Sequence, residues 1–250
     1  MNDAALNGNG AVTGYGTARH AEPFPFWDRR RLLGEWTVRE SADRMANYRW
    51  AEQQFSAALG GWSATIPELD VKASLGRVCF EHAWHADLWR ERLPELQERN
   101  DERCEPPNDD FVTFMNELTG PDDPDATIEK LVGIYRVMIP HMLAVYTFHR
   151  HVTSHIVDAP TVRILNFMIH DDGVQYVEGE MLIQDLARTE ELCARAGKWK
   201  NHLDWLLAKS GGMAGPKTLG GRPKIQMPGK AILGAALREQ IEARAGSADQ

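Results

Sequence analysis

Apolar residues recur alternately three and four positions apart in four long stretches of the chain, the spacing of one face of an α-helix. The stretches are residues 41–59, 70–96, 126–149 and 160–196. We expect the first to end at Gly60 and Gly61, the third to bend at Pro140, and the fourth to begin at Pro160. This periodicity predicts an all-α protein built from four long amphipathic helices.

The segments between and after these helices differ from them in composition. Residues 98–125 are acidic and proline-rich apart from the short apolar run 111–118, so we expect a long crossover connection that carries one small helix. A further helical piece at 198–209 is expected to continue the fourth helix after Gly197. A long crossover between the second and third helices is typical of ferritin-like antiparallel four-helix bundles.

This organisation predicts one main domain with two appended ends. Residues 1–25 are expected to form a disordered tail, and the aromatic segment 22–27, where the tail joins the bundle, is expected to pack on the bundle from outside. Residues 26–210 are expected to form the helical bundle. Residues 211–250 are expected to form a basic loop rich in glycine and proline, followed by a short helix at 231–245.

Charge and cysteine usage narrow the classes of protein. The 250 residues carry a formal net charge of −8, which disfavours a general binder of nucleic acid or of anionic membranes. No apolar run reaches the roughly 18 residues of a membrane span, and no signal peptide is expected. Cys79, Cys104 and Cys193 stand far apart, as in a reducing compartment. We therefore expect a cytoplasmic protein.

The buried stripe of each predicted helix contains a side chain able to bind a metal. The first two stripes are Met45, Tyr48, Glu52, Phe55 and Leu59, then Val71, Leu75, Val78, His82, His85 and Trp89. The other two are Leu131, Ile134, Met138, His141, Val145 and Phe148, then Val162, Leu165, Ile169, Asp172, Tyr176, Gly179 and Ile183. Buried carboxylates and imidazoles must be hydrogen-bonded, neutralised or coordinated, so one shared cause is expected for all four interruptions.

The spacing of these residues suggests that they meet. Glu52 and His82 are 30 positions apart, and His141 and Asp172 are 31 apart. Two antiparallel hairpins with nearly equal offsets place both pairs at similar heights along the bundle. The sequence therefore predicts one polar cluster at mid-bundle.

The cluster resembles the metal site of the ferritin-like superfamily, which includes rubrerythrins, ribonucleotide reductase small subunits and diiron enzymes of the tRNA-hydroxylase type. The pattern is one Glu from each of two helices and a Glu-x-x-His from each of the other two. Glu52 matches the first Glu, and His82-Ala-Trp-His85 matches the first Glu-x-x-His with His82 in place of Glu. The resemblance implies that Glu52, His82 and His85 would be metal ligands.

The second half of the pattern departs further from the family. His141 stands where the third-helix Glu is expected, and Asp172-Gly-Val-Gln175 replaces the second Glu-x-x-His with Asp and Gln. Only two of six ligands, Glu52 and His85, keep their type, so too few carboxylates remain to balance two cations. The diiron motif is therefore degenerate, and a mononuclear site for Fe, with Mn or Zn as alternatives, becomes the expectation.

Alternatives remain open for individual residues. Glu81 points toward a helix edge or solvent, unless the second helix is rotated, in which case Glu81 and His85 become the ligand pair. Gln175 is expected to hydrogen-bond a bound water or oxygen as a catalytic group. The cluster of His149, His151 and His155 is interpreted as a cationic cap at a helix C-terminus.

Two functions follow from these residues. The first is a metal-dependent oxidase or oxygenase that acts on an unknown small or RNA-borne substrate and uses Glu52, His82, His85, His141 and Asp172 as ligands. The second is a metal-free interaction or assembly protein in which the same residues form a buried hydrogen-bond network. A homodimer is expected in either case.

Overall fold

The computed structural model describes residues 36–96 and 103–215, and these residues contain helices and no strands. The all-α prediction is therefore confirmed. The long helices are α3 (Val38–Thr65), α4 (Leu69–Glu95), α8 (Ala159–Leu186) and α9 (Glu190–Ser210). The remaining segments are α5 (Asp109–Thr119), the 3-10 turn η1 (Pro124–Ala126), α6 (Thr127–Val132), the π-helical turn η2 (Gly133–Met138) and α7 (Ile139–Val152).

The chain divides into a unit of Met1–Thr218 and a unit of Leu219–Gln250, and all described residues belong to the first. The predicted tail at 1–25, its aromatic segment at 22–27 and the predicted helix at 231–245 lie outside the described residues.

Helix α3 is longer at both ends than the spacing predicts. It begins with a capping box, in which Thr37 and Glu40 exchange hydrogen bonds with each other's backbone. The predicted end at Gly60 and Gly61 is wrong, because the helix continues to Thr65. Trp62 is buried there and its indole N–H donates to the carbonyl of Pro121 (2.7 Å). This packing outweighs the cost of about 1 kcal/mol for each helical glycine.

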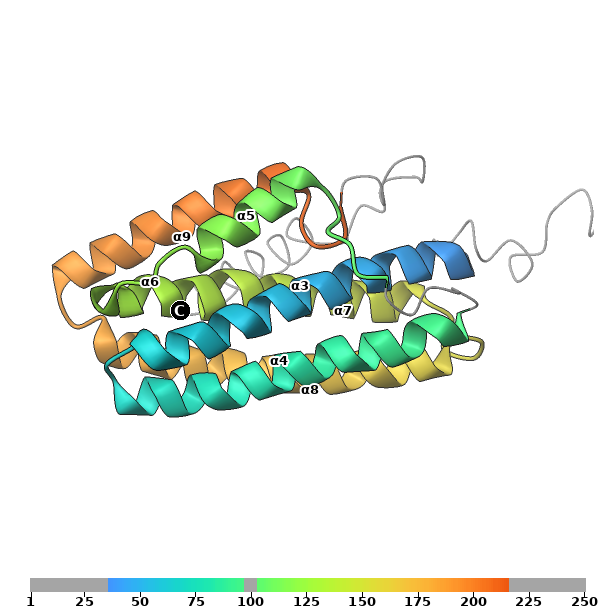
Figure 1. The fold of residues 1–250 in the computed structure, drawn as a ribbon, viewed down its shortest axis with the longest axis horizontal. Helices are drawn as coiled ribbons and strands as arrows, with labels where there is room; N and C mark the ends of the chain where they lie inside the picture. Colours follow the sequence, from blue (N-terminus) through green and yellow to red (C-terminus); the bar gives the residue numbers. More distant parts are fainter. Residues whose placement is uncertain (1–35, 97–102, 216–250) are drawn as a thin grey trace, which may run out of the picture. The chain divides into compact units, whose positions relative to one another are not determined.

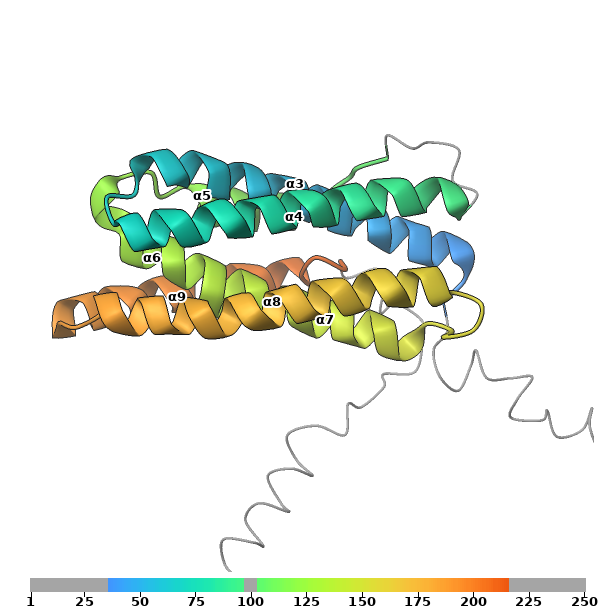
Figure 2. The ribbon, with the colours of Figure 1, turned by 90° about the horizontal axis from the view of Figure 1, so that it is seen from below.

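The long helices form two antiparallel pairs. Helices α3 and α4 are one pair, α7 and α8 are the other, and Figure 2 shows them as two layers. The chain returns along α5 after α4, so α6 and α7 run in the same direction as α4, and α9 lies beside α5 and α6 (Figure 1). The predicted small helix in a long connection between the second and third long helices is thereby confirmed as α5.

The third long helix contains a π-helical turn instead of a simple bend. The distortion spans Gly133–Met138 and ends where the Ile139 N–H donates to the carbonyl of Ile134, five residues earlier. It lies directly before Pro140, which has no N–H and whose ring would crowd the carbonyl of Arg136. The predicted bend at Pro140 is therefore close to the observed irregularity, but the irregularity is a change of helical period and not a simple bend.

This turn changes which residues face the core. One extra residue in a helical turn rotates the following segment by about 100°. Met142, Tyr146 and His149 are fully buried after the turn, in place of the predicted Val145 and Phe148. The predicted stripe is therefore correct up to Met138 and wrong beyond it.

The predicted fourth helix is two helices. Helix α8 ends at Leu186, and α9 begins after Thr189, whose side chain accepts from the N–H of Leu192 (3.2 Å). Gly197 lies inside α9 and starts no new helix. On α8, Tyr176 is exposed, contrary to its predicted place on the buried stripe. The structure instead buries Met168 and Gln175, with Val162 and Ile169 only half-buried.

The helical run Pro124–Val152 is long and apolar enough to cross a membrane by length and composition, although no membrane span is expected from the sequence. Core helices of proteins without any membrane contact meet the same criterion. More than half of its most apolar window, 56%, is buried against the other helices. Its apolar character is accounted for by this packing.

Candidate metal centre

Three potential metal ligands come together at the middle of the first helix pair. Glu52 lies on α3, and His82 and His85 lie one turn apart on α4. All three side chains are fully buried, and one ligand atom from each lies within 4.8 Å of the others. The buried stripes predicted for these two helices therefore meet as expected.

The carboxylate of Glu52 is the centre of this group. Its Oε2 atom lies 2.6 Å from Nδ1 of His82, and its Oε1 atom accepts a hydrogen bond from the Tyr146 hydroxyl (2.5 Å). Nδ1 of His85 lies 3.6 Å from Oε1, too far for a hydrogen bond. Both imidazoles thus present the same ring nitrogen, Nδ1, to one carboxylate.

The other nitrogen of each imidazole is fixed by helix α8. Nε2 of His82 lies 3.0 Å from the amide oxygen of Gln175, and Nε2 of His85 lies 3.2 Å from the carboxylate of Asp171. The amide nitrogen of Gln175 donates to Glu81 (2.7 Å), so its oxygen must face His82. Metal-binding histidines are commonly held in this way, with the outer N–H donated to a carboxylate or carbonyl oxygen.

These contacts determine where the protons lie. Oxygen atoms of Gln175 and Asp171 can only accept, so Nε2 of both histidines carries a hydrogen. In a neutral imidazole, Nδ1 is then a lone pair, and the lone pair of His82 would face the carboxylate of Glu52 at 2.6 Å. Two acceptors at this distance require a positive charge between them, either a proton or a metal cation.

Asp172 adds a second carboxylate to the region. It is fully buried on α8, and neither of its oxygen atoms has a hydrogen-bond partner. Burial raises its pKa to about 7, although the nearby charges of His82 and His85 act in the opposite direction. A buried carboxylate without a hydrogen-bond partner is costly, so Asp172 requires a proton or a nearby cation to be stable there.

The electrostatics of the group favour charged forms despite burial. Burial alone would raise the pKa of Glu52, but the charge and hydrogen bond of His82 and the nearby charge of His85 lower it to about 2. Burial alone would lower the pKa of His85, but its contacts with Asp171 and Glu52 raise it to about 10. The carboxylate of Glu52 is thus ionised, and the imidazole of His85 beside it carries a compensating proton.

Aromatic rings close the group from solvent. The ring of Phe55 lies edge-on to His82 with centroids 4.7 Å apart, and the ring of Trp84 lies 6.0 Å from His85. Tyr146 covers the side of Glu52 that faces α7. Charges in such a setting are weakly screened by water, which strengthens their interaction.

His141 does not join the group. The π-helical turn rotates it out of the core, and its Nε2 instead accepts the backbone N–H of Met213 (2.9 Å). Burial of the His141 imidazole lowers its pKa to about 4. The same helical rotation brings Tyr146 to Glu52, where its hydroxyl donates a hydrogen bond to the carboxylate.

The remaining predictions concern residues around the group. Glu81 faces the edge of α8, as first expected, and bonds Gln175 instead of pairing with His85. Gln175 is buried, with its amide engaged by His82 and Glu81. The interpretation of His149 as a cationic cap is wrong: it is fully buried, and burial lowers its pKa to about 3.

Two residues of the centre are missing from the sequence prediction. Tyr146 follows from the π-helical register, for which the sequence offers only the nearby Pro140 as a signal. Asp171 lies beside the predicted stripe and not on it, and the edge of a stripe is where an outer partner of His85 must lie.

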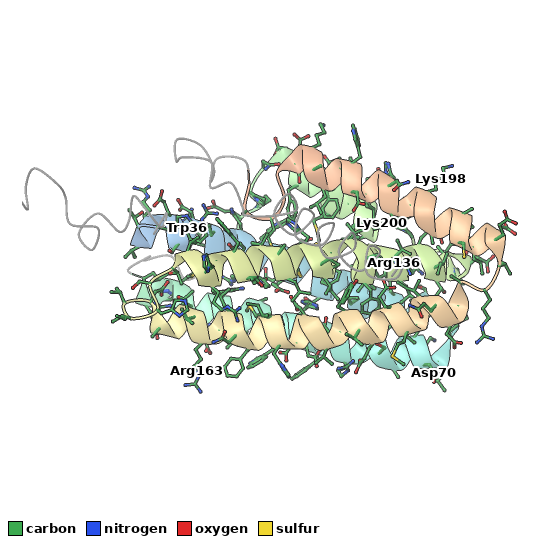
Figure 3. All side chains as sticks on the ribbon, turned by 180° about the vertical axis from the view of Figure 1, so that it is seen from behind. Trp36, Asp70, Arg136, Arg163, Lys198 and Lys200 are labelled. Carbon is green, nitrogen blue, oxygen red and sulfur yellow. The ribbon has the colours of Figure 1, made fainter. Side chains whose placement is uncertain are left out.

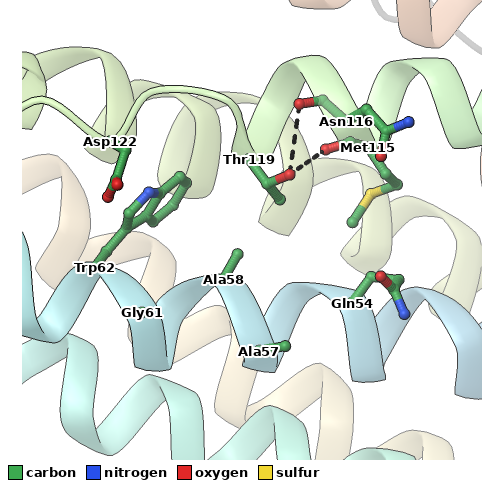
Figure 4. A pocket seen from close by; sticks show the side chains of 9 residues that line it. All are labelled: Gln54, Ala57, Ala58, Gly61, Trp62, Met115, Asn116, Thr119 and Asp122. Atoms are coloured by element: carbon green, nitrogen blue, oxygen red, sulfur yellow. Dashed lines mark hydrogen bonds between the residues drawn. The ribbon is translucent and has the colours of Figure 1, made fainter.

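A separate hollow lies between α3 and α5 (Figure 4), with a volume of about 310 Å³. It is lined by small residues of α3, by polar residues of α5 and by Trp62 and Asp122 at one end. None of its lining residues belongs to the group around Glu52.

Comparison with known proteins identifies no relative: no protein-family model, no curated protein and no solved structure matches the chain.

Proposed function

We propose that Glu52, His82 and His85 hold a single divalent metal ion and that Asp172 supplies a further carboxylate to it. The observation that carries this proposal is the arrangement of Nδ1 atoms around Glu52. Both outer nitrogens are committed to acceptors, while the inner nitrogen of His85 and both oxygens of Asp172 have no hydrogen-bond partner. A cation among Glu52, His82 and His85 would satisfy the inner nitrogen of His85 and would bring a positive charge near the carboxylate of Asp172, which lies outside this group of three.

The donor set indicates which metal fits. Two imidazoles and one carboxylate form the ligand type of non-haem Fe(II) enzymes, and Mn(II) and Zn(II) accept the same donors. With both Glu52 and Asp172 ionised, a divalent ion leaves the buried centre electrically neutral. The extra proton that the raised pKa of His85 holds on this imidazole would be released as the metal binds.

The protein would contribute orientation and exclusion of water. Gln175 and Asp171 fix the two imidazoles, and the Tyr146 hydroxyl fixes one oxygen of Glu52. Fe(II) in such a centre supplies one-electron chemistry with O₂, so an oxidase or oxygenase is the reaction class proposed. The direction of the helices, with one long connection between the two pairs, supports a ferritin-like bundle as the parent fold.

The test is the metal content of the full chain. Protein purified without chelator and loaded anaerobically with Fe(II) is measured by plasma mass spectrometry. We expect about one iron per chain, and loss of the iron in His85→Ala, which removes a central donor. His151→Ala, an exposed histidine on α7, is the matched control and should keep the metal.

The rival is a metal-free network in which protons alone satisfy the group. On that account neither the wild type nor His85→Ala binds metal above background. His85→Ala then lowers the free energy of unfolding by about 1–3 kcal/mol, because the buried contacts of His85 are lost. Circular dichroism of both variants separates a lost ligand from a lost fold.

A further inference from the structure

The outer surface of α4 and α8 exposes an unusual number of large apolar side chains. We call this surface the α4–α8 face, and its members are Phe80, Trp84, Phe167, Val174, Val177 and Met181. Phe80 is 70% exposed and Met181 is 66% exposed. The rings of Trp84 and Phe167 lie 6.0 Å apart, so the face continues across the boundary between the helices.

The face follows the line along which the two helices touch. Three polar contacts join the helices at successive heights: Arg77 with Glu178, Glu81 with Gln175, and His85 with Asp171. Phe167, Val174 and Met181 recur every seven residues and therefore lie along one edge of α8 beside this line. Phe80 and Trp84 are one turn apart and occupy the facing edge of α4.

The size of the face fits a protein interface. Covered aromatic side chains contribute roughly 150–250 Å² each, so six partly exposed large residues offer roughly 600 Å² of apolar area. A stable interface buries about 800 Å² per partner, and this face is at the upper end of the roughly 300–600 Å² range of the largest apolar patch on a monomer, where such patches are often functional. With the area of the surrounding polar side chains added, the face reaches the area that one partner buries in a standard interface.

The charges at its ends indicate which partner it fits. Arg163 and Asp70 are exposed and lie at opposite ends of the two helices in Figure 3. Glu81 and Gln175 mark a common height, from which Arg163 lies 12 residues away along α8 and Asp70 lies 11 residues away along α4. At 1.5 Å per residue both are roughly 17 Å from this height, in opposite directions.

A two-fold axis that runs across the outer surface of the face, perpendicular to the helices and at the height of the Glu81–Gln175 contact, would therefore bring Arg163 of one copy to the height of Asp70 of the other. Because the pair occurs twice in a symmetric dimer, a single chain supplies both complementary charges. No second protein is needed to explain the position of the apolar residues or of these charges.

We propose that the α4–α8 face is the interface of a homodimer whose two-fold axis crosses the surface of the face at the height of the Glu81–Gln175 contact. The partner covers Phe80 and Val174 near the axis, and Arg163 pairs with the partner's Asp70 at each end. Glu81 and Asp171, whose side chains remain 21% and 24% exposed, are then shielded from solvent. Dimerisation would thus close the outer wall of the metal centre.

Analytical ultracentrifugation of the full chain over a range of micromolar concentrations tests this interface. We expect a dimer, and Phe80→Asp should raise its dissociation constant by about 10- to 100-fold, as for a central contact. Trp205→Asp, on an equally exposed residue of α9, is the matched control and should leave the dissociation constant unchanged. A wild-type chain that is monomeric throughout, or a dimer that Phe80→Asp leaves intact, would overturn the proposal.

Charge reversal tests the position of the axis. Arg163→Asp should raise the dissociation constant about tenfold, and the double variant Arg163→Asp with Asp70→Arg should restore it because the pair is reformed with reversed charges. A double variant that dimerises no better than Arg163→Asp alone would overturn this arrangement. Metal content is measured in parallel, so failure of the interface is distinguishable from failure of the metal centre.

Discussion

Replacing Gly179 by alanine tests the register that the π-helical turn gives to the core. A Cβ atom at this position would lie 2.0 Å from Cγ and 2.1 Å from Cδ1 of the Tyr135 ring. Tyr135 belongs to the π-helical turn, is fully buried, and shares a hydrogen bond with the hydroxyl of Ser74 (3.1 Å). The ring therefore cannot move aside without breaking this bond or displacing the turn.

The magnitude follows from two opposing effects. An alanine in place of a helical glycine stabilises by about 1 kcal/mol, whereas forcing a methyl group into a packed core costs about 1–3 kcal/mol or more. Gly173, on the same helix with nothing within 4 Å of its Cβ position, experiences the first effect alone. The first effect is common to both variants and cancels, so their free energies of unfolding should differ by the second effect, about 1–3 kcal/mol or more.

Urea denaturation followed by far-ultraviolet circular dichroism measures this difference, provided that both variants keep the wild-type dependence on denaturant. We expect Gly173→Ala to be slightly more stable than the wild type and Gly179→Ala to be clearly less stable. Equal stabilisation of both variants would refute the reasoning, because Tyr135 would then not occupy the position that the π-helical register assigns to it.

Three further predictions concern other parts of the bundle. Tyr146→Phe leaves one oxygen of Glu52 unpartnered and should lower the free energy of unfolding by about 1–3 kcal/mol; denaturation curves that match the wild type would contradict the hydrogen bond. Gly212→Ala should destabilise by about 1–2 kcal/mol, since Gly212 has a φ of 73° and its Cβ would lie 2.3 Å from His141, and unchanged stability would place that turn elsewhere. The pKa of His149 falls from its ordinary 6.5 to about 3 on burial, so only the unfolded chain binds its proton between these values. Stability should therefore decrease as pH falls below 6.5, by up to about 1.4 kcal/mol per pH unit, and His149→Leu should reduce that slope.

The first helix pair was predictable because its two faces differ. In α4 the buried positions alternate with exposed charged ones, so the spacing identifies His82, His85 and Trp89 together. The same argument places Glu52 opposite them on α3. The buried ligand residues could thus be predicted from the sequence on helices that have one side in solvent.

The third helix lacks that contrast. Every residue from Leu131 to Tyr135 is buried, so an apolar period carries no information about rotation there. The extra residue of a π-helical turn does not change the apolar pattern of such a segment. The predicted rotation of the helix is therefore wrong for His141 and for the residues after it. The break between α8 and α9 did have a local signal, namely Thr189 followed by two acidic residues, which is typical of a helix start.

Anomalous X-ray diffraction from crystals of the iron-loaded chain, collected at the iron absorption edge, locates the metal directly. The metal-centre account predicts one strong peak per chain, bounded by Glu52, His82 and His85. The absence of any peak among these residues, or a peak only at exposed histidines such as His151, would contradict it.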